Sequence, residues 1–353
     1  MKPQVAIIGC GRPGGGQARG HVRGWKSADC EVVALCDIAH GNAVALRDDF
    51  GLTNARLYTD SNELLANEKL DFVSVCLWPH LHAPVVLAAA KAGVRAIHCE
   101  KPVAPRLDEA RAMVQECESR GVQLTFNHQR RFLQGFQEAR RLLQNGAIGE
   151  LDSMEAYCPD LFDWGTHWFD MMLGFNDQNP VDWVMAQVDW REAMAIFGVP
   201  IERFGIAHFK CQNGVRGTLV GGRGDEMENG VRVRLTGTQG MIEVGQGRTG
   251  KSDGLRLMNN SATGWQELPV QSENGGDDPY PRVMADLVRA LETSQPSVLG
   301  AQNALQATEL IFAAYESARL SERVTLPLEG VTSHPLLAIL REHDAVPEKT
   351  LIN

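Results

Sequence analysis

The sequence lacks the features that define several protein classes. No apolar run in the 353 residues approaches the roughly 18 residues that a membrane-spanning helix requires. The 8 cysteines include no C-x-x-C pair, so we expect reduced, buried thiols, no disulfide framework and no bound metal. Positive charge is scarce, since 34 Lys and Arg residues face 44 Asp and Glu residues and leave a formal charge of -10. This charge argues against nucleic acid as a partner.

The rest of the composition is that of an ordinary globular protein, with 44% hydrophobic and 22% charged residues. A chain of 353 residues is too long for one compact core, so we expect two domains. The first strand-like run begins at Val5, close to the initiator methionine. We therefore expect no signal peptide and a cytoplasmic protein.

A glycine-rich loop follows this first run. Its spacing fits the G-x-G-x-x-G fingerprint, in which the first glycine permits a tight turn, the second lets the backbone approach a pyrophosphate and the third allows close packing of helix and strand. A plain flexible turn explains the spacing about as well when it is taken alone. The candidate cofactor-binding residues of the loop are Gly9, Gly11, Arg12, Pro13 and Gly14.

A second strand-like run ends in Asp37, 23 residues beyond Gly14. An aspartate at this point can accept hydrogen bonds from both ribose hydroxyls and would repel a 2′-phosphate, which favours NAD over NADP. A helix N-cap or an Asx turn is the alternative interpretation of Asp37.

Helix and strand patterns alternate from there to Phe126, which is typical of a doubly wound parallel sheet. Within this region, Glu100-Lys101-Pro102 follows a short buried run that ends at Cys99. A lysine at the carboxyl end of a strand lies where open α/β sheets bind their ligands, although a solvated Lys-Pro turn is the commoner case for such a tripeptide alone. We expect residues 1–126 to form a Rossmann domain.

A second group of chemically active side chains lies at Asp163-Trp-Gly-Thr-His-Trp-Phe-Asp170. Asp163 and His167 are four residues apart and share one face of a helical turn, with Asp170 one turn further on. Taken alone, a histidine between tryptophans would more often be a core residue.

Strand-like segments follow one another from Val181 to Val244 without intervening helices. This order predicts a C-terminal α+β domain over residues 127–353, with an open, largely antiparallel sheet. The chain as a whole is therefore expected to belong to the α/β class. Because one face of such a sheet would stay uncovered, we expect a homodimer or homotetramer.

The glycine loop, Asp37, His82 and the Glu100-Lys101-Pro102 signature together resemble the glucose–fructose oxidoreductase, inositol dehydrogenase and rhizopine-catabolism (Gfo/Idh/MocA) family. The family's Asp-x-Gly-x-His-x-x-Asp pattern also occurs in full from Asp163 to Asp170. The resemblance covers residues 4–330. It implies a Rossmann domain that binds NAD and a second domain that binds the substrate.

The resemblance also implies roles for single residues. Lys101 would lie beside the nicotinamide and the reacting carbon, often after a cis peptide to Pro102. His167 would donate and accept the proton, and Asp163 would bind the substrate or orient His167. Asp170 would be structural.

Three further residues are implied with alternatives. Arg131, which precedes an aromatic residue at the domain crossover, would reach the substrate or be solvated or ion-paired. Trp78 stands where the family has a Thr-Pro pair, and it could pack against the cofactor or fill space. Trp164 could offer a flat face to a sugar ring or belong to the core. His82 and Glu100 complete the candidate cofactor-binding set.

The function that this resemblance implies is an NAD-dependent oxidoreductase acting on a secondary hydroxyl of a sugar, polyol or sugar derivative. Lys101 and His167 would be its proton-transfer pair. Two alternatives stay open: a glycoside hydrolase that retains NAD and works by transient oxidation and elimination, and a dinucleotide-binding regulator without catalysis. The presence of Lys101, Asp163 and His167 together argues against the regulator.

Overall fold

The computed structural model describes residues 2–222, 232–246, 254–270, 278–331 and 333–352, and it divides into two units. The first unit comprises residues 1–129 and 278–305, and the second comprises residues 130–277 and 306–353. The predicted boundary after residue 126 is thus three residues early. The segment 278–305 also differs from the prediction, because it returns to the first unit.

The first unit is built on six strands in the order β3-β2-β1-β4-β5-β6. Each neighbouring pair runs parallel, and the order is that of a Rossmann fold, so the predicted doubly wound sheet is confirmed. The strands are β1 (Gln4–Ile8), β2 (Glu31–Cys36), β3 (Arg56–Tyr58), β4 (Phe72–Val75), β5 (Ala96–Cys99) and β6 (Gln123–Phe126).

Local sequence signals set the ends of several helices in this unit. Helix α2 ends at Gly51, whose φ of 64° is a left-handed C-cap. Asp60 caps α3 by accepting a hydrogen bond from the Asn62 N–H. The helices are α1 (Ala18–Ser27), α2 (His40–Phe50), α3 (Ser61–Asn67), η1 (Pro79–Leu81), α4 (His82–Lys91), α5 (Leu107–Ser119), α8 (Tyr280–Thr293) and the first residues of α9 (Ala301–Leu320).

Close packing of α1 on α8 holds the returning segment to the Rossmann unit. A Cβ atom on Gly20 would lie 2.4 Å from the ring of Tyr280, and one on Gly24 would lie 2.7 Å from the side chain of Met284. Two glycines on one face of α1 therefore let the two helices approach each other. The Phe126 N–H, on the edge strand β6, also donates to the Leu299 carbonyl at 3.1 Å.

The second unit contains a sheet of nine strands in the order β16-β15-β14-β13-β7-β12-β11-β8-β17. Among its described strands only β7 and β12 pair in parallel, so the predicted largely antiparallel sheet is confirmed. Its strands are β7 (Leu151–Cys158), β8 (Val181–Asp189), β11 (Phe204–Cys211), β12 (Arg216–Gly222), β13 (Val233–Gly237), β14 (Gly240–Gln246), β15 (Gly254–Asn259), β16 (Gln266–Leu268) and β17 (Val324–Thr325), and a separate hairpin is formed by β9 (Met194–Ile196) and β10 (Val199–Ile201).

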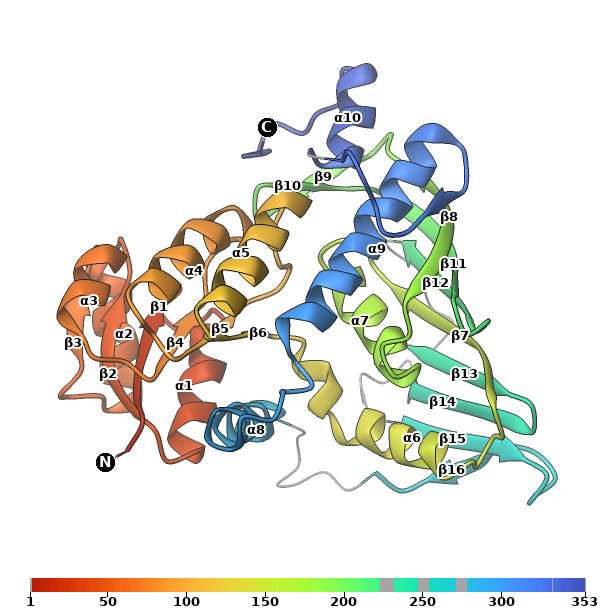
Figure 1. The fold of residues 1–353 in the computed structure, drawn as a ribbon, viewed down its shortest axis with the longest axis horizontal. Coiled ribbons are helices and arrows are strands. Elements are labelled where there is room, and N and C mark those ends of the chain that lie inside the picture. The colour runs from red at the N-terminus through yellow and green to blue at the C-terminus, as the bar shows by residue number, and fades with distance from the viewer. Residues whose placement is uncertain (1, 223–231, 247–253, 271–277, 332, 353) are drawn as a thin grey trace. The chain divides into compact units, whose positions relative to one another are not determined.

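Helices cover one face of this sheet. Figure 1 shows α6 (Gln134–Gln144) and α7 (Gly165–Phe175) on the same side of the strands. Phe169 of α7 packs against Phe209 of β11, with ring centroids 6.1 Å apart. The short turn η2 (Gln129–Phe132) precedes α6, and α10 (Pro335–Glu342) lies near the C-terminus. In the described part of the chain, no helix combines the length and apolar character needed to cross a membrane.

Candidate active site

The glycine-rich loop leaves strand β1 at its carboxyl end. Gly9 has a φ of 91°, and a Cβ atom there would lie 2.4 Å from the Cys76 carbonyl oxygen, so only glycine fits. Gly14 also has a positive φ, but no described atom lies within 4 Å of the position of its Cβ. The close packing expected of Gly14 is therefore wrong. The open space beside it instead leaves room for a phosphate group near the amino end of α1.

The Asp37 carboxylate already has partners in the protein. It accepts hydrogen bonds from the Cys10 N–H at 2.9 Å, from the Ala39 N–H at 2.9 Å and from the Asn42 amide at 3.1 Å. The bond to Ala39 is the predicted Asx turn. Because a carboxylate offers about four acceptor positions, the turn leaves capacity for a ribose hydroxyl.

Trp78 and His82 follow the next strand, β4, at the same edge of the sheet. The Trp78 side chain is 49% exposed. His82 is buried, and its Nδ1 and Nε2 atoms lie 3.1 Å and 3.0 Å from the carbonyls of Val103 and Leu77. Burial lowers the pKa of His82, while the two carbonyls act in the opposite direction; a neutral ring has one N–H and can donate to only one of them.

Lys101 lies two residues beyond the carboxyl end of strand β5, as the sequence predicted, and its peptide to Pro102 is cis. The preceding Glu100 points into the unit and is only 4% exposed. Its Oε1 atom lies 3.0 Å from the Nε2 atom of His21 and 2.7 Å from the amide nitrogen of Asn127. The protein thus uses the Glu100 carboxylate to hold the backbone that presents Lys101.

Further residues complete the surroundings of Glu100. The other ring nitrogen of His21 lies 3.0 Å from the Ser74 hydroxyl, and the Asn127 amide also lies 3.3 Å from the Tyr280 hydroxyl. Burial alone would raise the pKa of Glu100, but hydrogen bonding and attraction from His21, with the Asn127 amide, hold it below the usual value. Glu100 is therefore an ionised, fully enclosed anchor.

In the second unit, Asp160 shapes the loop that leads into α7. Its Oδ1 atom accepts hydrogen bonds from the backbone N–H groups of Phe162, Asp163 and Trp164, at 3.0, 2.5 and 3.2 Å. A Cβ atom on Gly165 would lie 2.9 Å from the Asp160 carbonyl, which explains the glycine in the Asp-x-Gly-x-His pattern. Asp160 therefore fixes the backbone that carries Asp163.

The predicted substrate residues gather around the start of α7, with Asp163 and Trp164 just before the helix and His167 in its first turn. Asp163 is 7% exposed and His167 is 3% exposed, whereas Trp164 keeps 36% of its surface exposed. His167 is the third residue of α7, and its N–H donates to the Trp164 carbonyl at 3.1 Å. The structure thus brings Asp163, Trp164 and His167 together in one unit, while Lys101 belongs to the other, and the pairing of Lys101 with His167 stays a prediction.

Arg131 lies against α7 in the way the ion-paired alternative expects. Its Nε and Nη2 atoms donate to the two carboxylate oxygens of Asp170 at 2.5 and 2.9 Å. Gly174, one turn further along α7, makes room for this guanidinium, since a Cβ there would lie 2.5 Å from Nη1. This ion pair is the structural role that the resemblance implied for Asp170. The Asp170 carboxylate occupies the two side-by-side N–H donors that Arg131 would need to bind a substrate.

Sequence reasoning missed four contributors to the site. His21, Asn127 and Asp160 support the predicted residues, and Arg130 lies over the tryptophans of α7. Only Asp160 left a local signal, because an aspartate three residues before the start of a predicted helical turn is a common N-cap.

No group of three His, Cys, Asp or Glu side chains that could hold a metal ion occurs among the described residues.

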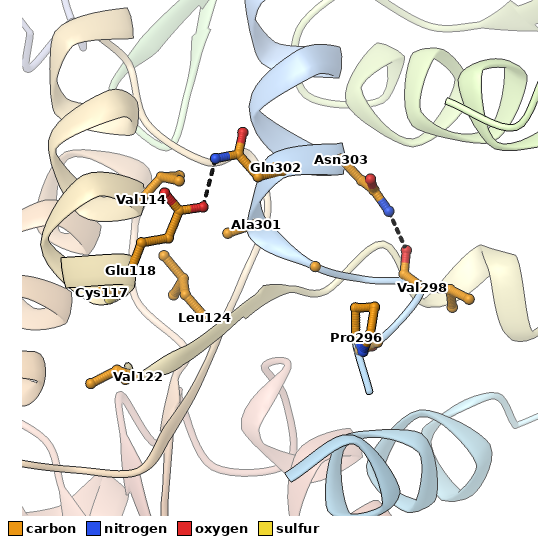
Figure 2. A pocket seen from close by; sticks show the side chains of 12 residues that line it. Val114, Cys117, Glu118, Val122, Leu124, Pro296, Val298, Ala301, Gln302 and Asn303 are labelled. Carbon is orange, nitrogen blue, oxygen red and sulfur yellow. Dashed lines mark hydrogen bonds between the residues drawn. The ribbon is translucent and has the colours of Figure 1, made fainter. Parts of the chain in front are cut away.

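A separate pocket of about 390 Å³ lies in the first unit between α5, β6 and the start of α9. Figure 2 shows Glu118 bonded to the Gln302 amide on its wall, at 2.6 Å, and the Asn303 amide bonded to the Val298 carbonyl, at 3.0 Å. The pocket includes Val122, just before β6, and so opens at the amino end of that strand. Rossmann sheets bind dinucleotides at the opposite, carboxyl ends of their strands, so this pocket is not the expected cofactor site.

Comparison with known proteins identifies both parts of the chain. Residues 4–128 match the family model described as an oxidoreductase family with an NAD-binding Rossmann fold. Residues 161–243 match the model of the GFO/IDH/MocA C-terminal domain.

Curated relatives match part of the chain. A D-apiose dehydrogenase of Paraburkholderia graminis is 41% identical over 145 residues, which are 41% of this chain and 37% of the relative. A D-glucoside 3-dehydrogenase of Escherichia coli is 34% identical over 149 residues, which are 42% of this chain and 41% of the relative. The matches thus span about two fifths of each relative.

Solved structures share the whole fold. A levoglucosan dehydrogenase in complex with NADH and levoglucosan aligns with a TM-score of 0.81 at 18% identity, covering 93% of this chain and 100% of that one. At this identity the likeness shows the fold alone.

Proposed function

Because this chain belongs to the Gfo/Idh/MocA family of NAD-binding oxidoreductases, we propose that it is an NAD-dependent dehydrogenase of a secondary hydroxyl in a sugar, polyol or sugar derivative. The observation that carries this proposal is Lys101, presented at the carboxyl end of β5 by the enclosed Glu100 anchor. The names of the curated relatives, dehydrogenases of apiose and of glucosides, agree with this substrate class.

The cofactor half of the proposal rests on the first unit. The glycine-rich loop, with open space over Gly14, would hold the pyrophosphate at the amino end of α1. Asp37 would hold the ribose, and Trp78 and the backbone around Glu100 would line the nicotinamide end. NAD would accept the hydride that leaves the substrate carbon.

The proton chemistry falls to the chain itself. When hydride leaves a secondary alcohol, the hydroxyl proton must leave as well, and a positioned base accelerates this step. We assign the transfer to Lys101 and His167, with Asp163 orienting His167 or holding a neighbouring substrate hydroxyl. The half-exposed Trp164 would support one face of the sugar ring.

The oligomer is part of the same proposal. On the sheet face opposite α7, Met185 of β8 and Ile206 of β11 are 52% and 37% exposed. Further along that face, Arg234 pairs with Glu155 and Glu243, and Arg256 pairs with Glu243, so these two arginines are balanced by two carboxylates. An apolar, internally neutral face suits a second copy of the same chain, and we propose a homodimer or homotetramer built through it.

A screen of sugars, inositols and glycosides with purified protein and NAD tests the function. The expected result is NADH that accumulates in proportion to a sugar or polyol consumed. Release of the aglycone from a nitrophenyl glycoside, without net NADH, would favour the redox-neutral glycosidase instead. Dinucleotide binding without turnover of any compound would contradict both enzymatic functions and favour a dinucleotide-binding regulator.

A further inference from the structure

Arg130 lies on the tryptophans of α7. The centre of its guanidinium lies 5.0 Å from the centroid of the Trp164 ring and 5.2 Å from that of Trp168. These are cation–π distances, so both indole rings attract the guanidinium. Arg130 is thus a cation placed over two aromatic rings.

The Nε atom of this guanidinium distinguishes Arg130 from the neighbouring Arg131. The buried Nε atom of Arg130 has no hydrogen-bond acceptor among the described residues. Arg131 offers the contrast, because its edge is filled by the Asp170 carboxylate. A guanidinium carries five N–H donors arranged to meet two oxygens side by side, so an edge without an acceptor is suited to receive an oxyanion.

A second cation strengthens the local positive charge. Burial lowers the pKa of Arg130, and the charge of Arg232 lowers it further. Arg232 immediately precedes β13 and is exposed. Two guanidinium groups that repel each other would both be stabilised by one anion close to them.

We propose that Arg130 is the receptor for an oxyanion carried by the substrate, a carboxylate or a phosphate, and that the preferred substrate is therefore an acidic rather than a neutral sugar or polyol. This inference rests on the proposed function, since it names the substrate of the same site. It also assigns the substrate contact to Arg130, whereas the sequence assigned it to Arg131.

The position of Arg130 relative to the other site residues agrees with this role. Trp164, whose ring centroid lies 5.0 Å from the centre of the guanidinium, is the N-cap residue of α7 and stands three residues before His167. An oxyanion bound beside the unpaired Nε atom of Arg130 would keep the attached carbon chain close to the first turn of α7. Binding at the acidic end would then position a hydroxyl further along the chain for reaction.

Binding to the full-length protein tests the receptor without relying on turnover. Tryptophan fluorescence would be titrated with gluconate, glucose 6-phosphate and glucose, because Trp164 and Trp168 flank the proposed contact. We expect at least one of the two anions to bind ~10–100-fold more tightly than glucose, as hydrogen bonds to charged groups allow, and the preference to weaken at high salt. Whichever of gluconate and glucose 6-phosphate binds more tightly shows whether the oxyanion of the substrate is a carboxylate or a phosphate.

Variants of the arginine make the test specific. Arg130→Met removes the charge and keeps an unbranched side chain on the indoles, and Arg130→Lys keeps the charge but not the fork. We expect Arg130→Met to lose the preference for the anion over glucose and Arg130→Lys to keep part of it. Arg141→Met, at an exposed arginine paired with Glu138, serves as the control. Thermal unfolding would confirm that the variants are folded.

The outcomes separate this inference from the proposed function. Equal binding of gluconate, glucose 6-phosphate and glucose, or anion binding that is unchanged in Arg130→Met, would contradict the proposal that Arg130 binds an oxyanion. If neutral sugars are then oxidised with formation of NADH, the proposed dehydrogenase activity is supported independently of Arg130. If no compound yields NADH but anion binding still depends on Arg130, the anion site is supported and the proposed dehydrogenase activity is contradicted.

Discussion

Arg131 and Asp170 form a bidentate ion pair that is almost closed to solvent. Their side chains are 11% and 1% exposed, and Arg131 also donates to the Asp170 carbonyl at 2.7 Å. The pair joins the turn before α6 to the middle of α7, which carries His167 four residues after Asp163. It therefore stabilises the helix on which the candidate active site stands.

Breaking this pair should cost stability. Asp170→Ala would leave the Arg131 guanidinium enclosed without its carboxylate, and we expect a loss of about 3–5 kcal/mol in the free energy of unfolding, measured in urea. Arg141→Ala, which breaks an exposed pair with Glu138, should cost no more than about 1 kcal/mol. If Asp170→Ala unfolds like the unaltered protein and changes only substrate affinity, Arg131 belongs to the substrate site after all.

The choice between NAD and NADP should depend on the charge of Asp37. Asp37→Asn removes the charge and keeps one oxygen, which can still accept the Ala39 N–H bond, whereas an NH2 group replaces the oxygen that accepts from the Cys10 N–H. We expect NAD to bind more tightly than NADP in the unaltered protein, and Asp37→Asn to narrow the gap by about tenfold, or about 1.4 kcal/mol, in calorimetric titrations. Equal affinities in the unaltered protein would show that Asp37 acts only in its turn.

Much of the first unit could be predicted because its signals are local. Buried runs, glycines at turns and the spacing of Asp37 after the loop each lie within a few tens of residues. The return of residues 278–305 could not be predicted in this way. It depends on Gly20 and Gly24 fitting against side chains of α8, some 260 residues further along the chain.

In the candidate active site, too, contacts between distant parts of the chain could not be predicted from the sequence. The sequence pointed to Asp163 and His167 through a compact pattern, but it could not decide between two adjacent arginines. Arg131 meets Asp170, 39 residues away, while Arg130 turns to the indoles of Trp164 and Trp168. Which arginine meets the carboxylate depends on how α7 faces the preceding turn, and that is a property of packing.

Lys101 should be needed for turnover but not for binding of NAD. Lys101→Met removes the proton-transfer group and keeps an unbranched side chain one atom shorter, so we expect turnover to fall by roughly 10²–10⁴-fold. The dissociation constant of NAD, measured by calorimetry, should change little, because the loop and Asp37 hold the phosphates and ribose. Lys91→Met, at an exposed lysine that ends α4, is the matched control. Normal turnover in Lys101→Met would remove Lys101 from the mechanism.

A charge on the open sheet face should dissociate the proposed oligomer. Ile206→Asp places a carboxylate where we expect a second copy to bury an apolar side chain, and burial of an unpaired charge is strongly unfavourable. Light scattering at micromolar concentration should show a dimer or tetramer for the unaltered protein and a smaller species for Ile206→Asp. Val346→Asp, at another exposed apolar residue, should leave the mass unchanged. A monomeric unaltered protein would rule out the oligomer.

The stability of the second unit should depend on pH through Asp160. Burial, together with the nearby charges of Glu202 and Asp163, raises the pKa of Asp160 from 3.8 to about 8. Its Oδ2 atom is buried and has no acceptor or donor among the described residues, whereas both oxygens of Glu202 are occupied by the Leu161 N–H and the Tyr315 hydroxyl. A proton gained by this group of carboxylates is therefore best placed on the Oδ2 atom of Asp160.

The sign of the effect follows from this raised pKa. Between about pH 4 and pH 8 the native state holds a proton that the unfolded chain has released, so the free energy of unfolding should fall as the pH rises, by at most about 1.4 kcal/mol per pH unit. Asp160→Asn mimics the protonated carboxyl and keeps an acceptor for the three backbone N–H groups. Urea unfolding across this range should therefore show a flatter profile for Asp160→Asn than for the unaltered protein, and greater stability above pH 8. Asp182→Asn, at an exposed aspartate, should keep the original slope. An unchanged slope in Asp160→Asn would show that the titrating proton belongs to another group.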